Sequence, residues 1–379
     1  MLHNYSYWEK SVYFKYDIVL IGSGIVGLNA AISLKTQSPC LKIAILESGF
    51  LPSGASTKNA GFACFGSISE LIEQEKKIGE VALHSLIKRR WDGLKKLRAL
   101  LGDQQIEFRK QGGYELFTSK DNLLANACDA KLEHFNALTA DITGTSSTFV
   151  KANEKIAQFG FNGVKSLLEN REEASIHTGK MMYLLTELAQ QLGVKIYNSC
   201  QVKSIDDNQF SKHLETNHGI FEAKAVLVCT NAFAKTFFKN IDLYPGRGQV
   251  IVTNSIPNLK LEGTFHYDQG YYYFRNIDNR ILIGGGRNLD FEAETTTEFG
   301  TTELVQKSLV SLLREVIIPE QEFRIEHSWS GIMAFGTTLE PIIEEVSPGI
   351  FCGLRCNGMG IAIGSQVGED LANLAIKHV

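Results

Sequence analysis

The sequence predicts an interleaved fold, in which a Rossmann-like α/β domain of the glutathione-reductase type shares the chain with a second domain built on a mixed or antiparallel sheet. Residues 16–21 and 42–46 are short apolar runs joined by a glycine-rich turn and a small-residue helix, which is typical of a β-α-β unit. Residues 249–283 instead hold four strand-like segments joined by short polar turns, which favours antiparallel pairing. The buried-strand style of the N-terminus returns at 194–205, 225–230 and 350–353. The two kinds of sheet therefore alternate along the chain.

The remaining segments fit between these strands. Helical spacing covers 25–35, 68–101, 121–138 and 179–191, and a last helix ends near Ala375. Residues 106–117 alternate like a hairpin with a bend at Gly112 and Gly113. We expect residues 1–75, 160–235 and 325–379 to form the Rossmann-like domain, and residues 76–159 and 236–324 to form the second domain.

Composition limits the function classes. The chain has 379 residues, 44% hydrophobic and 21% charged, with a net charge of -4, so a large core is available and disorder is excluded. The slight acidity makes nucleic-acid binding unlikely. Seven scattered cysteines without a C-x-x-C motif predict a reducing, cytoplasmic location and no metal site. The uncharged run from Ile18 to Leu34 is interrupted by glycines and Asn29, so we expect no membrane span or signal sequence. The oligomeric state is left open.

The first motif follows the first strand and has the pattern G-x-G-x-x-G. One glycine permits the tight turn, the second lets a pyrophosphate approach the backbone, and the third lets helix and strand pack closely. The second strand ends in Glu47 and Ser48, and Glu47 is placed to accept hydrogen bonds from ribose hydroxyls. These features predict a dinucleotide site, against the alternative of an ordinary buried turn, at Gly22, Ser23, Gly24, Ile25, Val26 and Gly27.

Two further segments fit a long cofactor. Residues 51–63 are small and rich in hydroxyl groups, so they can donate to phosphate and offer a close backbone approach, although a surface loop has the same composition. Residues 352–362 form a second glycine-rich turn into a helix, whose N-terminus would place positive potential beside a flavin, although the glycines can also be structural. Glu47 alone does not separate NAD from FAD.

Taken together, these motifs identify a resemblance. The chain resembles the D-amino-acid-oxidase-like superfamily of FAD-dependent oxidoreductases, which includes glycine oxidase, sarcosine oxidase and γ-glutamylputrescine oxidase, over nearly its whole length. The resemblance rests on the first motif, Glu47, G-A-S-T-K-N-A-G, V-L-V-C-T-N-A-F, P-G-R-G-Q-V and R-C-N-G-M-G. It implies that Val202 holds the adenine through its backbone and that the residues around Met359 lie at the flavin ring. The further cofactor contacts that we expect are Ala55, Ser56, Thr57, Asn59, Ala60, Gly61, Thr230, Asn231, Arg355, Asn357, Gly358, Gly360 and Ile361.

The resemblance also implies the reaction. Such enzymes oxidise a C–N bond: a hydride leaves the carbon next to an amine for flavin N5, and the imine then hydrolyses. No side-chain base is required if the amine binds neutral, so we name no catalytic residue. The short N-terminal segment Y-S-Y-W-E is similar to the extension of γ-glutamylputrescine-oxidase-like proteins.

The usual carboxylate anchors are missing. Met333 stands where several relatives place a carboxylate-binding arginine, and Ala362 stands where sarcosine oxidases place a lysine. A substituted or larger amine is therefore favoured over a free α-amino acid, unless an arginine from elsewhere takes over the anchoring. The arginines considered for this role are Arg275, Arg287 and Arg355.

Covalent attachment of the flavin is not expected. The position of a flavin-linking histidine in dimethylglycine-dehydrogenase-like relatives holds Lys58, and that of the linking cysteine in sarcosine oxidases falls near Gly331. Cys64 lies close in sequence, and a packed small residue is its favoured interpretation.

One strand of the second sheet carries candidate substrate contacts. Alternation directs Tyr271, Tyr273 and Arg275 to one face, which either lines the site or packs within the sheet. With Met333, they are our substrate-binding candidates. Three isolated histidines, His177, His266 and His327, are interpreted as surface or satisfied core residues. The alternatives to amine oxidation are a tRNA-uridine-modifying FAD enzyme, an NAD-linked dehydrogenase and a flavin-binding protein without turnover.

Overall fold

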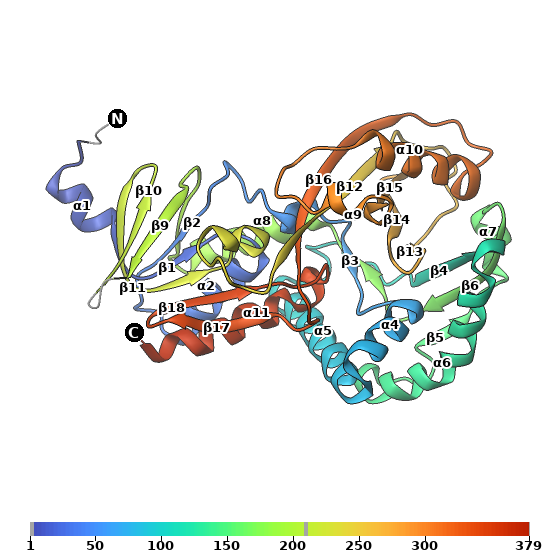
Figure 1. Ribbon diagram of the computed structural model, residues 1–379, viewed down its shortest axis with the longest axis horizontal. Helices are drawn as coiled ribbons and strands as arrows, with labels where there is room; N and C mark the ends of the chain where they lie inside the picture. Colours follow the sequence, from blue (N-terminus) through green and yellow to red (C-terminus); the bar gives the residue numbers. More distant parts are fainter. Residues whose placement is uncertain (1–3, 208–210, 379) are drawn as a thin grey trace.

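The N-terminal β-α-β unit is the centre of the first of two large sheets (Figure 1). The computed structural model describes residues 4–207 and 211–378. The strand order of this first sheet is β17-β18-β11-β1-β2-β8, and β9 and β10 continue from β11 as antiparallel strands. The strands β18, β11, β1, β2 and β8 are parallel. The bounds are β1 Lys15–Ile21, β2 Ile43–Leu46, β8 Lys195–Tyr197, β9 Val202–Asp207, β10 Lys212–Thr216, β11 Gly219–Val228, β17 Ile342–Ser347 and β18 Ile350–Leu354.

Helices cover one face of this first sheet (Figure 1). An aromatic-rich cluster of side chains covers the other face. The helices are α2 (Ile25–Gln37), α5 (Glu80–Leu101), α8 (Thr178–Gln191) and α11 (Gly360–Ala375). The helix α11 packs between α2 and α5, and this close packing needs a glycine, because a methyl group on Gly368 would lie 2.7 Å from the carbonyl oxygen of Val26. The core therefore fixes the N-terminal ends of α2 and α11 relative to each other.

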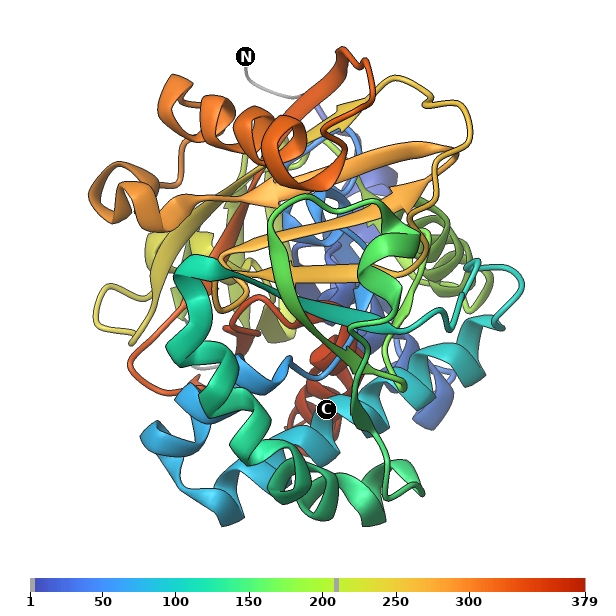
Figure 2. The same cartoon turned by 90° about the vertical axis from the view of Figure 1, so that its right-hand side faces the viewer.

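The second large sheet lies at the other end of the molecule (Figures 1 and 2). Its strand order is β16-β12-β15-β14-β13-β4-β6-β5, and all of its pairs are antiparallel except β13 with β4. The bounds are β4 Gly113–Thr118, β5 Phe149–Lys151, β6 Val164–Asn170, β12 Tyr244–Thr253, β13 Thr264–Tyr267, β14 Tyr272–Ile277, β15 Arg280–Gly285 and β16 Ile325–Phe335. A short pair, β3 (Phe62–Ala63) with β7 (Ala174–Ser175), completes the strands.

The second sheet buries one face against α10 (Glu303–Leu312) and the π-helical turn η4 (Leu313–Ile317), which Figure 2 shows in orange at the top. Near β4 and β6, a second apolar cluster packs against α4 (Ile68–Ile78), α5 and α6 (Asn122–Thr143). The shorter helical elements are α1 Tyr7–Tyr13, α3 Ala55–Lys58, α7 Lys155–Phe159, α9 Phe291–Glu294, η1 Ser119–Asp121, η2 Asn231–Thr236, η3 Arg287–Leu289 and η5 Ile376–His378. The face opposite α10 is turned toward the first domain.

The predicted architecture is confirmed, and three local predictions are wrong. Residues 106–117 do not form a hairpin, because only β4 is a strand and it pairs with β6 and β13, which come from later in the chain. Residues 68–101 form two helices, α4 and α5, because Gly79 has a φ of 79°. Residues 201–205 belong to the antiparallel strand β9 rather than to the parallel sheet.

The sheets also differ from the predicted domain ranges. Two strands of the second sheet, β6 and β16, lie inside the ranges 160–235 and 325–379 that were expected to form the first domain. The helix α5, expected in the second domain, packs in the core of the first through Leu86, Leu94 and Leu97. Among the described residues, no helix is both long and apolar enough to cross a membrane.

Candidate active site

The turn between β1 and α2 is shaped by glycine. Gly22 has a φ of 99°, and a side chain there would lie 3.0 Å from the carbonyl oxygen of Cys229. A methyl group on Gly27 would overlap the carbonyl oxygen of Gly22. The N-cap residue Gly24 makes no side-chain cap, and the first turn of α2 holds no acidic residue. The first turn of the helix therefore keeps its positive potential for an anion.

Glu47 lies beside this turn, at the end of β2, and only 6% of it is exposed. Its Oε2 accepts hydrogen bonds from the backbone N–H of Ser23 at 3.0 Å and from the Ser23 hydroxyl at 2.8 Å. Its Oε1 accepts from the N–H of Gly49 at 2.9 Å. The carboxylate is thus fixed against the glycine turn, and its binding of ribose hydroxyls stays a prediction.

The segment after β2 closes over the start of α2. The Ser56 hydroxyl accepts a hydrogen bond from the N–H of Ile25 at 2.9 Å. The Thr57 hydroxyl donates to the carbonyl of Pro52 at 2.7 Å, so it is engaged within its own loop. Asn59 Oδ1 accepts from the N–H of Gly61 at 2.9 Å and from the Thr178 hydroxyl at 2.8 Å. The segment from Ala55 to Gly61 is therefore held in place beside the glycine turn.

Two other strand ends meet the same turn. The N–H of Cys200, two residues before Val202, donates to the carbonyl of Glu47 at 2.8 Å. The Cα of Thr230 lies 3.6 Å from the position of a Cβ on Gly22. The Thr230 Oγ1 is buried and has no hydrogen-bond partner among the described residues, so the hydroxyl is available to a bound group.

Asn231, which follows β11, is hydrogen-bonded to the turn between β18 and α11. Asn231 Oδ1 accepts a hydrogen bond from the N–H of Arg355 at 3.3 Å. Arg355 and Asn357 both have positive φ, at 63° and 49°. The helix α11 then begins at Gly360 after the N-cap residue Met359, without a side-chain cap or an acidic residue in its first turn. The Met359 sulfur lies 4.0 Å from the Cys64 sulfur, which places this turn opposite the end of the segment that begins at residue 51.

One face of the second sheet faces the turn between β18 and α11, and near Tyr273 several positions on this face are glycines. Gly248 and Gly331 are paired across β12 and β16, and Gly284 is paired with Tyr273. A methyl group on Gly284 would lie 2.6 Å from the Tyr273 ring, so the ring lies flat over this glycine. The Met333 side chain reaches from β16 of the second sheet to the turn before α11, where its Sδ lies 3.9 Å from the position of a Cβ on Gly358. The glycines thus leave room for Tyr273 and Met333 between the sheet and the turn.

The other substrate-binding candidates have different roles. The Arg275 guanidinium is buried and donates from Nη1 to the carbonyl oxygens of Ile176 and Gly61 at 2.8 and 3.2 Å. Burial lowers its pKa to about 10. Arg275 lies on the same face as Tyr273, as expected. Its guanidinium, however, is hydrogen-bonded to the loop at Gly61 and is not directed toward a ligand. Tyr271 precedes β14 and packs against the apolar cluster under α10, so the face predicted for Tyr271 is wrong.

The side chain of Arg355 is also engaged. It is 5% exposed, and its guanidinium donates to Asp242, Thr338 and the carbonyl of Glu340. The side chain of Arg355 is therefore not free to bind a ligand, and only its backbone is available for contacts at the turn.

A buried ionisable cluster at the edge of this face was not predicted. His266 is 5% exposed, and its Nε2 lies 2.7 Å from Oε1 of Glu173. Within residues 4–207 and 211–378, Oε2 of Glu173 is buried and has no hydrogen-bond partner. Burial by itself would lower the pKa of His266, but the carboxylates of Glu173, Glu70 and Glu115 raise it to about 9. No sequence motif connects these residues. The pairing of β13 with β4 sets His266 beside Glu115, whereas Glu173 comes from the segment after β6 and Glu70 from α4.

The same cluster contains a thiol. Ligand atoms of Cys64, Glu173 and His266 lie within 4.8 Å of one another. Burial raises the pKa of Cys64 well above its ordinary value, and the protonated His266 is paired with Glu173. Because a metal needs a thiolate and a neutral imidazole, this chemistry favours an ion pair over a metal site.

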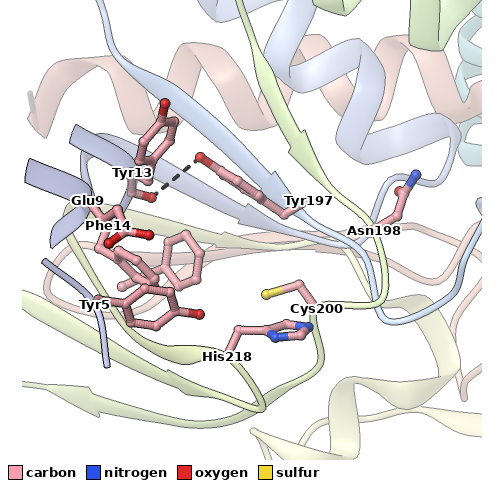
Figure 3. Close-up of a pocket in the computed structure, with 9 residues that line it drawn as sticks. Tyr5, Glu9, Tyr13, Phe14, Tyr197, Asn198, Cys200 and His218 are labelled. Carbon is pink, nitrogen blue, oxygen red and sulfur yellow. Dashed lines mark hydrogen bonds between the residues drawn. The ribbon is translucent and has the colours of Figure 1, made fainter. Parts of the chain in front are cut away.

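A separate cavity of about 320 Å³ lies against the N-terminal segment and is lined by none of the predicted site residues (Figure 3). Tyr5, Phe14 and Phe221 form its aromatic wall, with Tyr5 and Phe14 at a ring distance of 4.8 Å. The Tyr197 hydroxyl donates to the carbonyl of Tyr13 at 3.4 Å (Figure 3). The N-terminal extension thus forms α1 and packs on the first sheet.

The residues present fit FAD. The glycine turn, the fixed carboxylate of Glu47 and the Thr230 hydroxyl, which has no partner among the described residues, lie together. The helices that begin at both glycine-rich turns have no acidic residue in their first turn. Known proteins agree with this fit. The profile of the family described as FAD dependent oxidoreductase (DAO) matches residues 17–374. The chain belongs to this family.

Relatives and solved structures extend over most of the chain. The chain is 20% identical to "Probable oxidoreductase OrdL" of Haemophilus influenzae over 94% of this chain and 82% of that protein. It is 25% identical to the glycine oxidase of Geobacillus kaustophilus over 71% of this chain and 70% of that protein. Its fold is similar to that of iminodiacetate oxidase from Chelativorans sp. BNC1, with a TM-score of 0.76, 18% identity and coverage of 96% of both chains.

Family membership decides between the two dinucleotides that Glu47 left open. This FAD dependent oxidoreductase is an enzyme with FAD as its cofactor, so the alternative of an NAD-linked dehydrogenase is set aside. The fold brings the predicted cofactor residues together from the β1–α2 turn, the loop after β2, the start of β9, the end of β11 and the turn before α11.

Proposed function

We propose that this enzyme oxidises the C–N bond of a substituted amine or amino acid. The observation that carries the proposal is the position of Met333, whose sulfur lies against Gly358 while its methyl group lies 3.0 Å from the position of a Cβ on Gly248. We infer that the amine binds in the space beside Met333, Tyr273 and Phe62, whose side chains lie near the turn expected at the flavin ring. When bound, FAD supplies the two-electron acceptor for a hydride from the carbon next to nitrogen.

The side chains around this space orient an uncharged amine and exclude water. Phe62 contacts the Tyr273 ring edge-on, at a centroid distance of 5.9 Å. Burial raises the pKa of Tyr273 to about 12, so its hydroxyl is neutral at physiological pH and can donate a hydrogen bond. No acidic residue pairs with Tyr273 or Met333 among the described residues. The chain thus positions the substrate, and the amine binds neutral without a side-chain base.

The substrate class follows from what replaces the usual anchors. Met333 brings a thioether to the position of the arginine, and Ala362 is buried under the turn, with 1% exposed. A free α-amino acid would leave its carboxylate against apolar groups there. A substituted amine without an α-carboxylate, or an amine whose carboxylate lies farther away, avoids this cost. The names of two relatives, iminodiacetate oxidase and glycine oxidase, agree with amine oxidation in this fold.

We propose that FAD is held without a covalent bond. The Cys64 thiol is buried, burial raises its pKa well above its ordinary value, and its sulfur lies 4.0 Å from the Met359 sulfur. The Lys58 ammonium lies over the Phe299 ring at 5.9 Å. Acid precipitation should therefore release all of the flavin into the supernatant, whereas flavin retained in the pellet would contradict this. The cytoplasmic location remains a prediction.

The function is tested by anaerobic reduction of the purified enzyme. We expect a flavin spectrum that bleaches when γ-glutamylputrescine is added, because its carboxylate lies far from the amine, and this amine should reduce the flavin faster than glycine or sarcosine does. Free FAD with the same amines is the control. If the protein holds no flavin even after reconstitution with FAD, or if no amine bleaches it, the proposal is wrong.

A further inference from the structure

The three arginines that the sequence offers as alternative anchors differ in their hydrogen bonds. Arg275 is hydrogen-bonded to carbonyl oxygens, and Arg355 is hydrogen-bonded to Asp242 and neighbouring oxygens. The guanidinium of Arg287 has no hydrogen-bond acceptor and no carboxylate within ion-pairing distance in the part of the chain that the structure describes. All five of its N–H donors are thus available to a ligand or to water.

Aromatic rings hold this guanidinium in place. It lies 4.1 Å from the centroid of the Phe335 ring and 5.2 Å from that of Phe291. The pKa of Arg287 is lowered by burial, and the nearby Tyr271 and Tyr244 partly offset this effect. Stacking on ring faces leaves the edge of a guanidinium free, and this edge matches the two oxygens of a carboxylate. Arg287 is therefore oriented without being neutralised.

Arg287 lies on the same face of the second sheet as Met333. Its Nη1 is 3.0 Å from the position of a Cβ on Gly246, which is paired with Met333 across β12 and β16. Gly248, two residues along β12 and on the same face, is the glycine that the Met333 methyl group and the Tyr273 hydroxyl approach. Two residues along a strand span roughly 7 Å. The guanidinium is thus displaced by about one such step from the space in which the amine is expected.

We propose that Arg287 binds a carboxylate of the substrate, separated by several bonds from the carbon that is oxidised. This inference rests on the proposed function and names its substrate class: an amine with a distal carboxylate. The carboxylate oxygens accept paired N–H bonds from the guanidinium, while the apolar groups at Met333 face the connecting methylene chain. Arg287 is a specificity-determining residue, and the oxidation itself needs no proton from it.

The test compares Arg287→Met with Arg314→Met. Arg314 is an exposed arginine over the Phe323 ring at 5.7 Å, on η4, and it serves as the matched control. The binding probe is hexanoate, which is 4-(methylamino)butanoate with CH₂ in place of NH, and its uncharged counterpart is hexanamide. Binding is followed by the change in the FAD absorption spectrum, so it needs no turnover. Arg287→Met should weaken hexanoate binding by about 10- to 100-fold and leave hexanamide unchanged.

Kinetics give a second readout. With 4-(methylamino)butanoate, Arg287→Met should raise KM by a similar factor and leave kcat within about threefold, while the KM of its amide stays constant. Arg287→Lys should restore part of the affinity, and it replaces the methionine variant if that one loses FAD. Equal effects on acid and amide, an unchanged hexanoate affinity, an equal effect in Arg314→Met, or no binding of hexanoate to the wild-type enzyme would overturn the proposal. If no amine reduces the wild-type flavin but hexanoate binding depends on Arg287, the proposed oxidation fails and the carboxylate site stands.

Discussion

Replacing Gly284 by alanine tests whether Tyr273 lies over the reacting amine. The added methyl group would lie 2.6 to 2.7 Å from three atoms of the Tyr273 side chain, including its hydroxyl oxygen. Ordinary contacts are about 3.5 to 4.0 Å, so the ring must move by about 1 Å. Overpacking of this kind costs about 1–3 kcal/mol of stability. A misplacement of about 1 Å in a positioning group lowers kcat/KM by about 100-fold.

The assay measures kcat/KM for amine oxidation together with FAD affinity and thermal unfolding. In Gly284→Ala, kcat/KM should fall by about 100-fold while the FAD Kd stays within about threefold, because the three atoms nearest to the added methyl group all belong to Tyr273. The matched control is Gly179→Ala in α8, where the methyl group meets only the His177 ring at 3.2 Å or more. In a Tyr273→Ala background, Gly284→Ala should have little further effect. If Gly284→Ala keeps kcat/KM within threefold of wild type, the reasoning about Tyr273 is refuted.

Three further variants test the rest of the site. Gly27→Ala should raise the FAD Kd by at least about tenfold, because its methyl group would overlap the carbonyl oxygen of Gly22. Equilibrium dialysis with FAD measures the Kd, and an unchanged value would contradict the role of this glycine. Arg355→Lys should lower the free energy of unfolding by about 1–3 kcal/mol in denaturant titrations, since an ammonium cannot reach all of the oxygens that the guanidinium binds; wild-type stability would show that these bonds contribute nothing. The pKa of His266 is raised from 6.5 to about 9 beside Glu173, so the stability that it contributes is fully present below about pH 6.5 and is lost as pH rises through 9, by roughly 3 kcal/mol. His266→Gln should remove this pH dependence, and a wild-type profile in the variant would disprove the pairing.

The cofactor half of the site was predictable because its chemistry is local in sequence. The turn at Gly22 and the acid at Glu47 are separated by one β-α-β unit, and the structure joins them through Ser23. The substrate half depends on pairings between distant strands. His266 looks isolated in the sequence because its ion-pair partner, Glu173, lies 93 residues earlier in the chain. Only the folded structure shows that the two side chains meet. Alternation along β14 correctly placed Tyr273 and Arg275 on one face, but it could not show that carbonyl oxygens would engage Arg275.

The failed hairpin has a similar cause. Residues 106–117 alternate, but the partner of β4 in a hairpin would be 106–111, and the structure gives that place to β6 and β13. Tertiary pairing thus overrides the local pattern. The sequence does not reveal why position 284 is a glycine, because the Tyr273 ring that Gly284 accommodates comes from the neighbouring strand.

The measurement that tests the central claim most directly is a single anaerobic turnover with product analysis. Enzyme with bound FAD is mixed with an equimolar N-substituted amine that bleaches it, and the products are identified by mass spectrometry. We predict one carbonyl product and one released amine for each FAD that is reduced, as expected for oxidation of a C–N bond followed by hydrolysis. Reduction of FAD with the C–N bond of the substrate left intact would contradict the account.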